Sequence, residues 1–176
     1  MNSLKVTVHQ AKEEELPIVQ DILMQTAGWL KSIGSKQWNG ILEGKDHHDT
    51  PAAIRRGEVY LATVQGRPAG MFVLWDRQSE WDGELWGIDE SQDYMYLHRV
   101  NIVREFAGQG VASKMLAASL EIAKDKGKKA VRLDCLASND YLNKFYAGAG
   151  FAQVGVAKDH DAGEQTADFN LYEQAV

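Results

Sequence analysis

The most restrictive feature of the sequence is a glycine-rich turn between a predicted strand and a predicted helix. The turn, Ala107-Gly108-Gln109-Gly110-Val111-Ala112-Ser113, follows the apolar segment Tyr94 to Val103 and opens the amphipathic segment Gly108 to Lys126. Glycines remove the Cβ atoms that would obstruct a ligand, and the first turn of a helix leaves N–H groups without acceptors. The turn therefore predicts an anion cradle suited to a pyrophosphate, with a ligand-free strand-to-helix turn as the alternative.

A second apolar strand is predicted just after that helix, from Ala130 to Leu136. Strand, helix and strand then form a βαβ unit, in which the two strands are expected to be parallel. The whole chain is expected to follow the order β, α, α, β, β, β, α, β, α, β, β. The other elements are expected at Leu4 to His9, Glu13 to Leu30, Thr50 to Arg56, Val59 to Val64, Met71 to Trp75, Asn139 to Ala147, Phe151 to Ala157 and Gln165 to Tyr172.

Local signals place several turns and caps. Thr50 is expected to cap a short helix that has Pro51 at its first position. The cluster Gln65-Gly66-Arg67-Pro68 is expected to join an antiparallel hairpin. The segment Trp81 to Gln92 has no clean period, and it is expected to be a loop that lines a site.

Composition limits the class of protein. The chain has 176 residues, 44% hydrophobic and 25% charged, which favours one globular α/β (α+β) domain over residues 1–176. Its net charge of −6 repels phosphate backbones, so no nucleic-acid partner is expected. Apolar runs stay far below the ~20 residues that span a bilayer, so no membrane segment is expected. A single cysteine, Cys135, and no apolar leader favour a cytoplasmic protein.

Two common phosphate-binding motifs fit this turn poorly. The Walker A pattern G-x-x-x-x-G-K-[ST] does not occur in the sequence. A Rossmann fingerprint would need a glycine where Ser113 stands, and the turn lies deep in the chain after several strands of antiparallel character. A nucleotide-binding, Rossmann-like enzyme is therefore kept only as a minor alternative.

Two motifs of the sequence resemble those of the GNAT superfamily of acetyl-CoA-dependent N-acetyltransferases. The first, Q/R-x-x-G-x-G/A after a strand, is met by Gly110 and Ala112, with Ile102 at the strand end. Ala107 departs from it, because Arg or Gln is usual at that position. The second motif, an Asn, a Tyr seven residues later and a Gly-Phe pair, is met by Asn139, Tyr146, Gly150 and Phe151.

This resemblance implies a fold and a cofactor. The fold is a mixed, strongly twisted sheet with splayed central parallel strands, flanked by helices. The pantetheine arm of acetyl-CoA would pair with the backbone of the first parallel strand, and the glycine-rich turn would hold the pyrophosphate. The implied cofactor contacts are Val100, Asn101, Ile102, Gly108, Gln109, Gly110, Val111, Ala112, Ser113 and Asn139. Asn139 is equally well explained as a helix N-cap.

The resemblance also names Tyr146 as the group that protonates the leaving thiolate, with simple ring packing as the alternative. The base is less defined. Asp134 interrupts an apolar strand, where desolvation raises the pKa of a carboxyl group, and some family members that act on ribosomal-protein N termini carry an acidic residue there. A structural pairing with Arg132 or Arg99 is the alternative for Asp134. His98 is a second candidate base.

Other reactive residues favour structural interpretations. Cys135 lies in an apolar strand without a neighbouring base, so core packing is preferred to an acyl-enzyme. His47-His48-Asp49 lacks the further ligands of a metal site and is expected to be a solvated loop. Five tryptophans fall near the expected acceptor site, where aromatic faces can hold a cation, but core packing is preferred for any one of them. They are Trp29, Trp38, Trp75, Trp81 and Trp86.

The sequence therefore predicts an N-acetyltransferase that moves an acetyl group from acetyl-CoA to a primary amine. The expected acceptor is a small cationic molecule that attacks directly in a ternary complex, with Tyr146 and Asp134 as catalytic residues and no metal. The alternative is an acyl-CoA-binding regulatory module of the same fold with little turnover, which the alanine at position 107 favours. A homodimer is compatible with the sequence.

Overall fold

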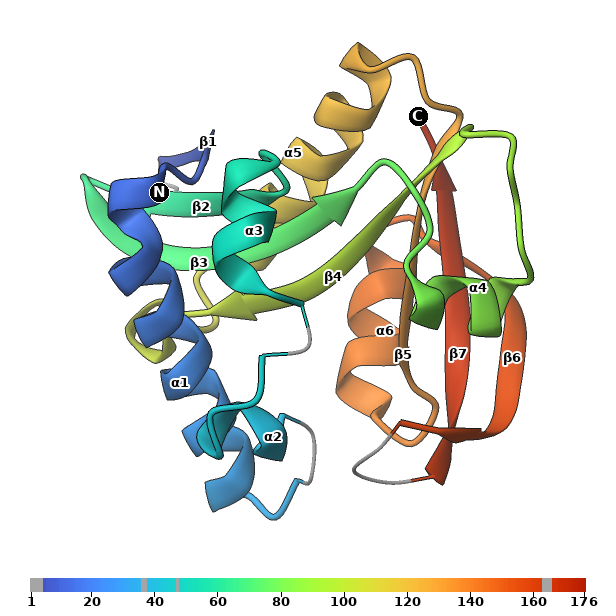
Figure 1. Ribbon diagram of the computed structural model, residues 1–176, viewed down its shortest axis with the longest axis horizontal. Coiled ribbons are helices and arrows are strands. Elements are labelled where there is room, and N and C mark those ends of the chain that lie inside the picture. Colours follow the sequence, from blue (N-terminus) through green and yellow to red (C-terminus); the bar gives the residue numbers. More distant parts are fainter. Residues whose placement is uncertain (1–4, 36–37, 47, 163–165) are drawn as a thin grey trace. The chain divides into compact units, whose positions relative to one another are not determined.

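The computed structural model describes residues 5–35, 38–46, 48–162 and 166–176, and its helices and strands are drawn in Figure 1. The chain divides into two compact units. Unit 1 comprises Met1–Val73 and Arg99–Met115, and unit 2 comprises Leu74–His98 and Leu116–Val176. The single domain expected over residues 1–176 stays a prediction.

In the described part of the chain, seven strands form one sheet in the order β1-β2-β3-β4-β5-β7-β6. The strands are β1 Val6–Gln10, β2 Val59–Val64, β3 Arg67–Trp75, β4 Tyr94–Ile102, β5 Ala130–Leu136, β6 Ala152–Asp161 and β7 Thr166–Ala175. The sheet is mixed, because β4 and β5 are parallel while β1 with β2, β2 with β3, β5 with β7 and β6 with β7 are antiparallel. The predicted mixed α/β fold, its parallel pair and its hairpin are confirmed.

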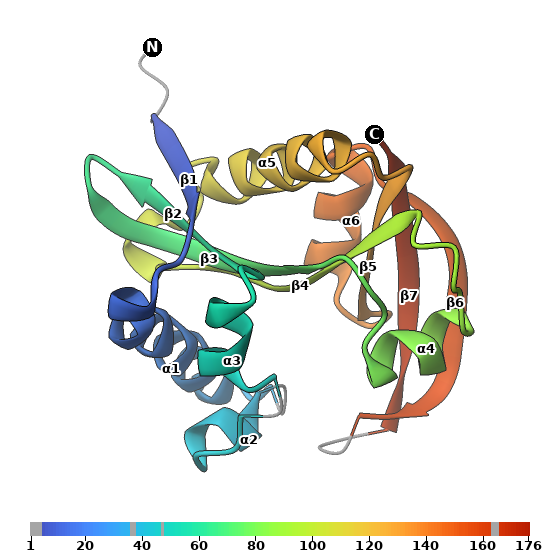
Figure 2. The ribbon, with the colours of Figure 1, turned by 45° about the horizontal axis from the view of Figure 1, so that its top comes forward.

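Unit 1 contains α1 (Leu16–Ser32), α2 (Asn39–Leu42) and α3 (Thr50–Arg55). Figure 2 shows α1 and α3 on one face of β2 and β3. Helical spacing places Val19, Ile22 and Leu23 of α1 on one buried side, and this apolar stripe supplies part of the core. Among the helices that the structure describes, none combines the length and the apolar composition that crossing a membrane requires.

Unit 2 contains α4 (Glu80–Trp86) and α6 (Asp140–Gly148), while α5 (Val111–Asp125) begins in unit 1 and ends in unit 2. Side chains alternate along a strand, so Asp134 and Cys135 of β5 point to opposite faces. Trp81 of α4 contacts Asp134, and Asn143 of α6 contacts Cys135. The two helices therefore cover opposite faces of the unit 2 sheet, as Figure 2 shows.

The parallel ladder between β4 and β5 is short. It runs from the pair Tyr94 and Ala130 to the pair Tyr96 and Arg132. β5 continues from there to Leu136 with β7 as its partner, and among the described residues its later part is paired with β7 alone. These are the two strands that the family resemblance implies to splay apart.

Two local predictions are wrong. The expected loop over Trp81 to Gln92 contains α4, which starts from a capping box in which the Ser79 and Asp82 side chains bond each other's backbone N–H groups. Thr50 is not the N-cap of α3; that position belongs to Asp49, whose carboxylate accepts a hydrogen bond from a backbone N–H of the first turn. In both places a short polar side chain satisfies backbone donors at a helix start.

Candidate active site

The glycine-rich turn in unit 1 has the geometry of an anion cradle. Gly108 and Gly110 have φ angles of +76° and +83°, which side-chain-bearing residues rarely adopt, and a Cβ added at either would meet open space. In the described part of the chain, the backbone N–H groups of residues 108–113 have no hydrogen-bond acceptor. The turn therefore offers free donors at the N-terminus of α5, and these fit a pyrophosphate.

The side chain of Gln109 is used locally, because its amide donates to the Glu105 carbonyl oxygen at 3.0 Å. This contact engages one N–H of the Gln109 side chain and leaves its backbone N–H for a ligand. Ala107 supplies no polar side chain in place of the usual Arg or Gln. A phosphate group at this turn would therefore meet mainly backbone donors.

The β4 backbone that precedes the turn is irregular at one residue. Arg99 has a φ angle of +53°, a conformation that is uncommon for any residue except glycine. The Asn101 side chain donates to the Arg99 carbonyl oxygen at 2.8 Å and accepts a hydrogen bond from the Thr26 hydroxyl at 2.9 Å. Asn101 is 6% exposed, so its side chain braces the strand and leaves its backbone as the group that can meet a cofactor.

The Arg99 side chain is itself held inside unit 1. Its guanidinium lies 3.5 Å from the Asp46 carboxylate and 3.4 Å from the Thr50 hydroxyl oxygen. Desolvation lowers the pKa of Arg99, and the Asp46 carboxylate opposes that shift. Within unit 1, Arg99 bonds these two residues, and its suggested pairing with Asp134 of unit 2 stays a prediction.

In unit 2, Asp134 is the ionisable group with the most unusual surroundings. The Trp81 indole N–H donates to its Oδ1 at 3.1 Å. Burial raises the pKa of the Asp134 carboxyl to about 6, while His98 and the Trp81 hydrogen bond act in the opposite direction. A carboxylate with such a pKa is ionised at neutral pH and accepts a proton more readily than an ordinary aspartate.

Asp82 and His98 lie beside Asp134. Asp82 is 1% exposed, and its carboxylate accepts hydrogen bonds from the Ser79 N–H and hydroxyl at 3.1 and 2.9 Å. The His98 Nε2 atom lies 3.0 Å from the same carboxylate, and its ring packs against Trp75 at 4.7 Å between centroids. His98 is therefore oriented by a buried aspartate.

Asp82, His98 and Asp134 bring two carboxylates and one imidazole nitrogen within 4.8 Å of one another. All three already have hydrogen-bond partners, because α4 and His98 use Asp82 while Trp81 uses Asp134. We therefore assign no metal to this cluster, and the absence of a metal stays a prediction.

Tyr146, the expected proton donor, lies on α6 with 7% of its surface exposed. Its ring packs against Phe145, Phe151 and Tyr172 at centroid distances of 5.4, 6.2 and 6.1 Å. Burial, with the nearby Cys135 and Asp134, raises the pKa of its hydroxyl above the usual value. The hydroxyl thus stays protonated at neutral pH, and no hydrogen-bond partner for it lies among the described residues.

The start of α6 is fixed by two asparagines. Asn139 is its N-cap, accepting a hydrogen bond from the Leu142 N–H at 3.0 Å. Asn143 accepts hydrogen bonds from the Tyr172 hydroxyl at 2.6 Å and, at 3.5 Å, from the Cys135 thiol. Burial raises the pKa of that thiol to about 12, so Cys135 has little thiolate for an acyl-enzyme. The N-cap interpretation of Asn139 is confirmed, and its contact with a cofactor stays a prediction.

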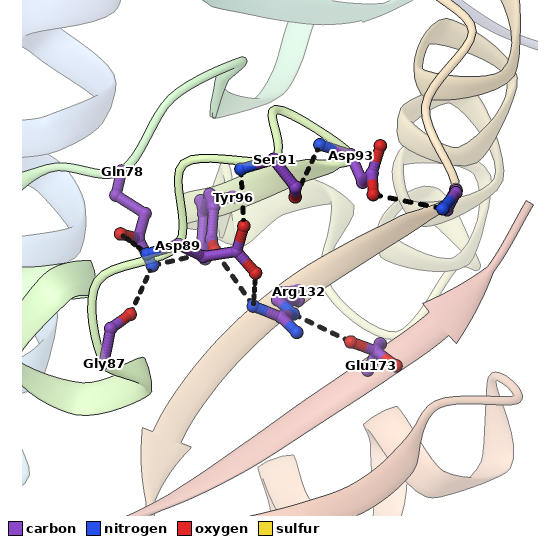
Figure 3. Close-up of polar contacts among 9 residues, drawn as sticks. Gln78, Gly87, Asp89, Ser91, Asp93, Tyr96, Arg132 and Glu173 are labelled. Atoms are coloured by element: carbon purple, nitrogen blue, oxygen red, sulfur yellow. Dashed lines mark hydrogen bonds and ion pairs between the residues drawn. The ribbon is translucent and has the colours of Figure 1, made fainter.

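Arg132 stabilises the region around the C-terminal end of α4. Its guanidinium bonds Glu173 at 2.7 Å and the Tyr96 hydroxyl oxygen at 3.0 Å, and it lies 4.0 Å from Asp89 (Figure 3). These partners show that Arg132 does not pair with Asp134. An adjoining cavity of about 530 Å³ is lined by residues 76–78, 89, 90, 92, 94 and 96, and neither Asp134 nor Tyr146 is among them.

The tryptophans have different roles. Trp81 bonds Asp134, Trp75 and Trp86 pack against His98 and Tyr96, and Trp29 lies under the Arg104 guanidinium at 3.9 Å. His47 lies outside the described residues, and Asp49 is an exposed residue outside any helix or strand, as expected, whose side chain also caps α3. The sequence analysis did not identify Asp82 as the partner of His98. The available signal at Asp82 was the pattern Ser79-x-x-Asp82, which is typical of a capping box and predicts the start of a helix.

Comparisons with known proteins agree with one another. A model described as "Acetyltransferase (GNAT) family" matches residues 25–151. An uncharacterized N-acetyltransferase of Bacillus subtilis, YesJ, is 37% identical over 142 residues, covering 81% of this chain and 79% of that protein.

Solved structures share the fold. A GNAT acetyltransferase of Listeria monocytogenes superimposes with a TM-score of 0.80 and 32% identity, covering 100% of this chain and 99% of its own. RimL, a ribosomal L7/L12 alpha-N-protein acetyltransferase in complex with coenzyme A, has a TM-score of 0.72, 18% identity and coverage of 99% and 96%. These matches do not favour the regulatory module, and they contradict the Rossmann-like alternative.

Proposed function

This chain belongs to the GNAT family of acetyltransferases, and from that premise we propose that its acceptor is the primary amine of a small cationic molecule. The protein is an acetyl-CoA-dependent N-acetyltransferase. We propose that the amine attacks the thioester directly, with Asp134 taking its proton and Tyr146 giving a proton to the leaving thiolate. We also propose a cytoplasmic location, since the one cysteine in the chain is a free thiol.

The residues of unit 1 support a role in holding acetyl-CoA. The free N–H groups of residues 108–113 match the pyrophosphate, because a helix N-terminus favours negative charge. The backbone of Val100, Asn101 and Ile102 would meet the amide groups of the pantetheine arm, as an adjacent strand would. The side chain of Asn101 is committed to Arg99 and Thr26, which fits a contact through the backbone alone.

The single observation that carries the mechanism is the carboxylate of Asp134. An alkyl ammonium has a pKa near ~10, so its proton must leave before the nitrogen attacks. A carboxylate with a pKa of about 6 accepts that proton, directly or through a water molecule, and is still ionised at pH 7. The C–N bond then forms as the C–S bond breaks, and the Tyr146 hydroxyl gives its proton to the leaving sulfur. The second proton that the nitrogen loses as it becomes an amide restores the Tyr146 hydroxyl, and Asp134 releases the first proton to water.

The acceptor class is supported by charge and by aromatic side chains in unit 2. The cavity of about 530 Å³ is lined by the rings of Tyr94 and Tyr96 and by more acidic than basic side chains. The acidic ones are Asp76, Asp89 and Glu90, and the basic one is Arg77. Cavities of this volume suit small molecules, and acidic and aromatic groups together favour a cation. The cavity supports the class of ligand and does not contain the reacting groups.

The test is the variant Asp134→Asn, which keeps the shape of the side chain and removes the base. At pH 7, kcat/KM for a cationic amine should fall about a hundredfold. The deficit should shrink as pH rises, because more of the amine then arrives neutral. For the wild-type protein, kcat/KM should fall below about pH 6, because Asp134 becomes protonated there. Steady-state kinetics at several pH values measure both effects.

The control for that test is thermal unfolding. An amide at position 134 avoids the cost of a desolvated charge, so the variant should unfold at a temperature no lower than the wild-type protein at pH 7. If the folded variant shows a pH profile parallel to that of the wild-type protein, Asp134 has a structural role and the mechanism is wrong.

A further inference from the structure

Helix α4 is fixed at both ends. Its N-terminus is closed by the capping box of Ser79 and Asp82. Gln78 holds the other end, because its amide nitrogen donates to the Gly87 carbonyl oxygen at 2.8 Å while its amide oxygen accepts from the Asp89 N–H at 2.9 Å (Figure 3). The first turn of α4, which carries Trp81, is therefore firmly placed within unit 2.

The Trp81 ring is equally constrained. It packs edge-to-face against Phe169 and His160, at centroid distances of 5.1 and 4.9 Å. Its N–H reaches Oδ1 of Asp134 at 3.1 Å. No other hydrogen bond to Asp134 is made by the described residues, so the Oδ2 atom has no protein donor among them.

We propose that Trp81 is a positioning residue for acetyl transfer, holding Oδ1 of Asp134 so that Oδ2 is the oxygen that takes the proton of the attacking amine. The inference rests on the proposed role of Asp134 as the base. A hydrogen bond to one carboxylate oxygen fixes the plane of the carboxylate and leaves the lone pairs of the other oxygen free. The proton acceptor is then oriented before the substrate arrives.

The charged groups around Asp134 do not replace this contact. His98 of β4 and His160 of β6 favour the ionised carboxylate, and Asp82 of α4 disfavours it. His98 lies 3.0 Å from Asp82 and His160 lies 3.0 Å from Glu84, so each imidazole has a carboxylate beside it.

On the neighbouring elements, Cys135 of β5 and Tyr146 of α6 have raised pKa values and stay neutral at pH 7. They therefore add no charge beside the carboxylate. The Trp81 N–H is left as the direct donor to it, and its removal should raise the pKa of Asp134.

The variant Trp81→Phe tests the inference, because phenylalanine keeps an aromatic ring at this position and removes the N–H donor along with the second ring of the indole. The Asp134 pKa, followed by ¹³C NMR of its carboxyl carbon, should rise by about one unit. At pH 7, kcat/KM should fall about tenfold, more than the roughly twofold that the change in ionisation explains, because the carboxylate also loses its orientation. The KM for acetyl-CoA should not change.

Trp86→Phe is the matched control. Trp86 lies on the same helix, and its indole nitrogen is buried with no hydrogen-bond partner among the described residues. This variant should leave the Asp134 pKa and the pH profile unchanged. Equal effects of the two substitutions would show that α4 responds to any loss of indole and would overturn the positioning role.

The two proposals fail in different ways. Wild-type kcat/KM in Trp81→Phe, while Asp134→Asn is impaired, would overturn the positioning role alone, even if the NMR titration shifts. Wild-type activity in Asp134→Asn would overturn the proposed base, and the positioning role with it.

Discussion

At the scale of single residues, the two proposed acid–base groups of unit 2 differ in the contacts that position them. Asp134 is bonded through one oxygen to Trp81, and Tyr146 is held by ring packing with its hydroxyl free of partners among the described residues. Both have raised pKa values, because both are desolvated. A raised pKa makes the carboxylate a better proton acceptor and keeps the phenol protonated, which suits the proposed roles of the two groups.

Tyr146→Phe should lower kcat about a hundredfold while leaving the KM for acetyl-CoA nearly unchanged, because the ring is kept and the proton donor is lost. Steady-state kinetics with direct detection of free coenzyme A measure both constants. Tyr172→Phe is the matched control, since its hydroxyl donates to Asn143 and its loss should affect stability more than kcat. A kcat within twofold of wild type in Tyr146→Phe would make Tyr146 a packing residue.

At the scale of elements, the β4–α5–β5 unit and helix α4 differ in how clearly the sequence predicts them. The long β4, α5 and β5 segments have clear periodicities and were predicted with their parallel pairing. Helix α4 spans seven residues, too few for a period to stand out, and only its capping pattern pointed to it. The positive φ angle of Arg99 had no sequence signal, because arginine is not typical of that conformation.

Gly110→Glu should weaken acetyl-CoA binding by at least about tenfold, or ~1.4 kcal/mol, because it places bulk and negative charge where the pyrophosphate is expected. Isothermal titration calorimetry measures the Kd. Gly110→Ala separates the causes, since it carries the same backbone strain at a φ angle of +83° without the charge. Unchanged affinity in folded Gly110→Glu would contradict the cradle.

At the scale of the whole molecule, the sequence motifs predicted the family and the mixed sheet. Contacts between residues that are distant in the sequence could not be predicted. Trp81 and Asp134 are 53 positions apart, so their hydrogen bond could not be read from local pattern. Desolvation of Asp134 was predictable from its apolar strand, but its partner was not. The net charge of −6 favours a cationic acceptor only weakly, because it says nothing of one pocket.

The most direct measurement is an acceptor screen with acetyl-CoA in which each product is identified by mass spectrometry. The panel should contain small cationic amines, amino acids with free carboxylates and peptides with free N termini. We expect the small cationic amines to gain one acetyl group with the highest kcat/KM and with release of one coenzyme A per product. Preferred acetylation of a peptide or of an anionic acceptor, or binding of acetyl-CoA without turnover on any amine, would contradict the proposed function.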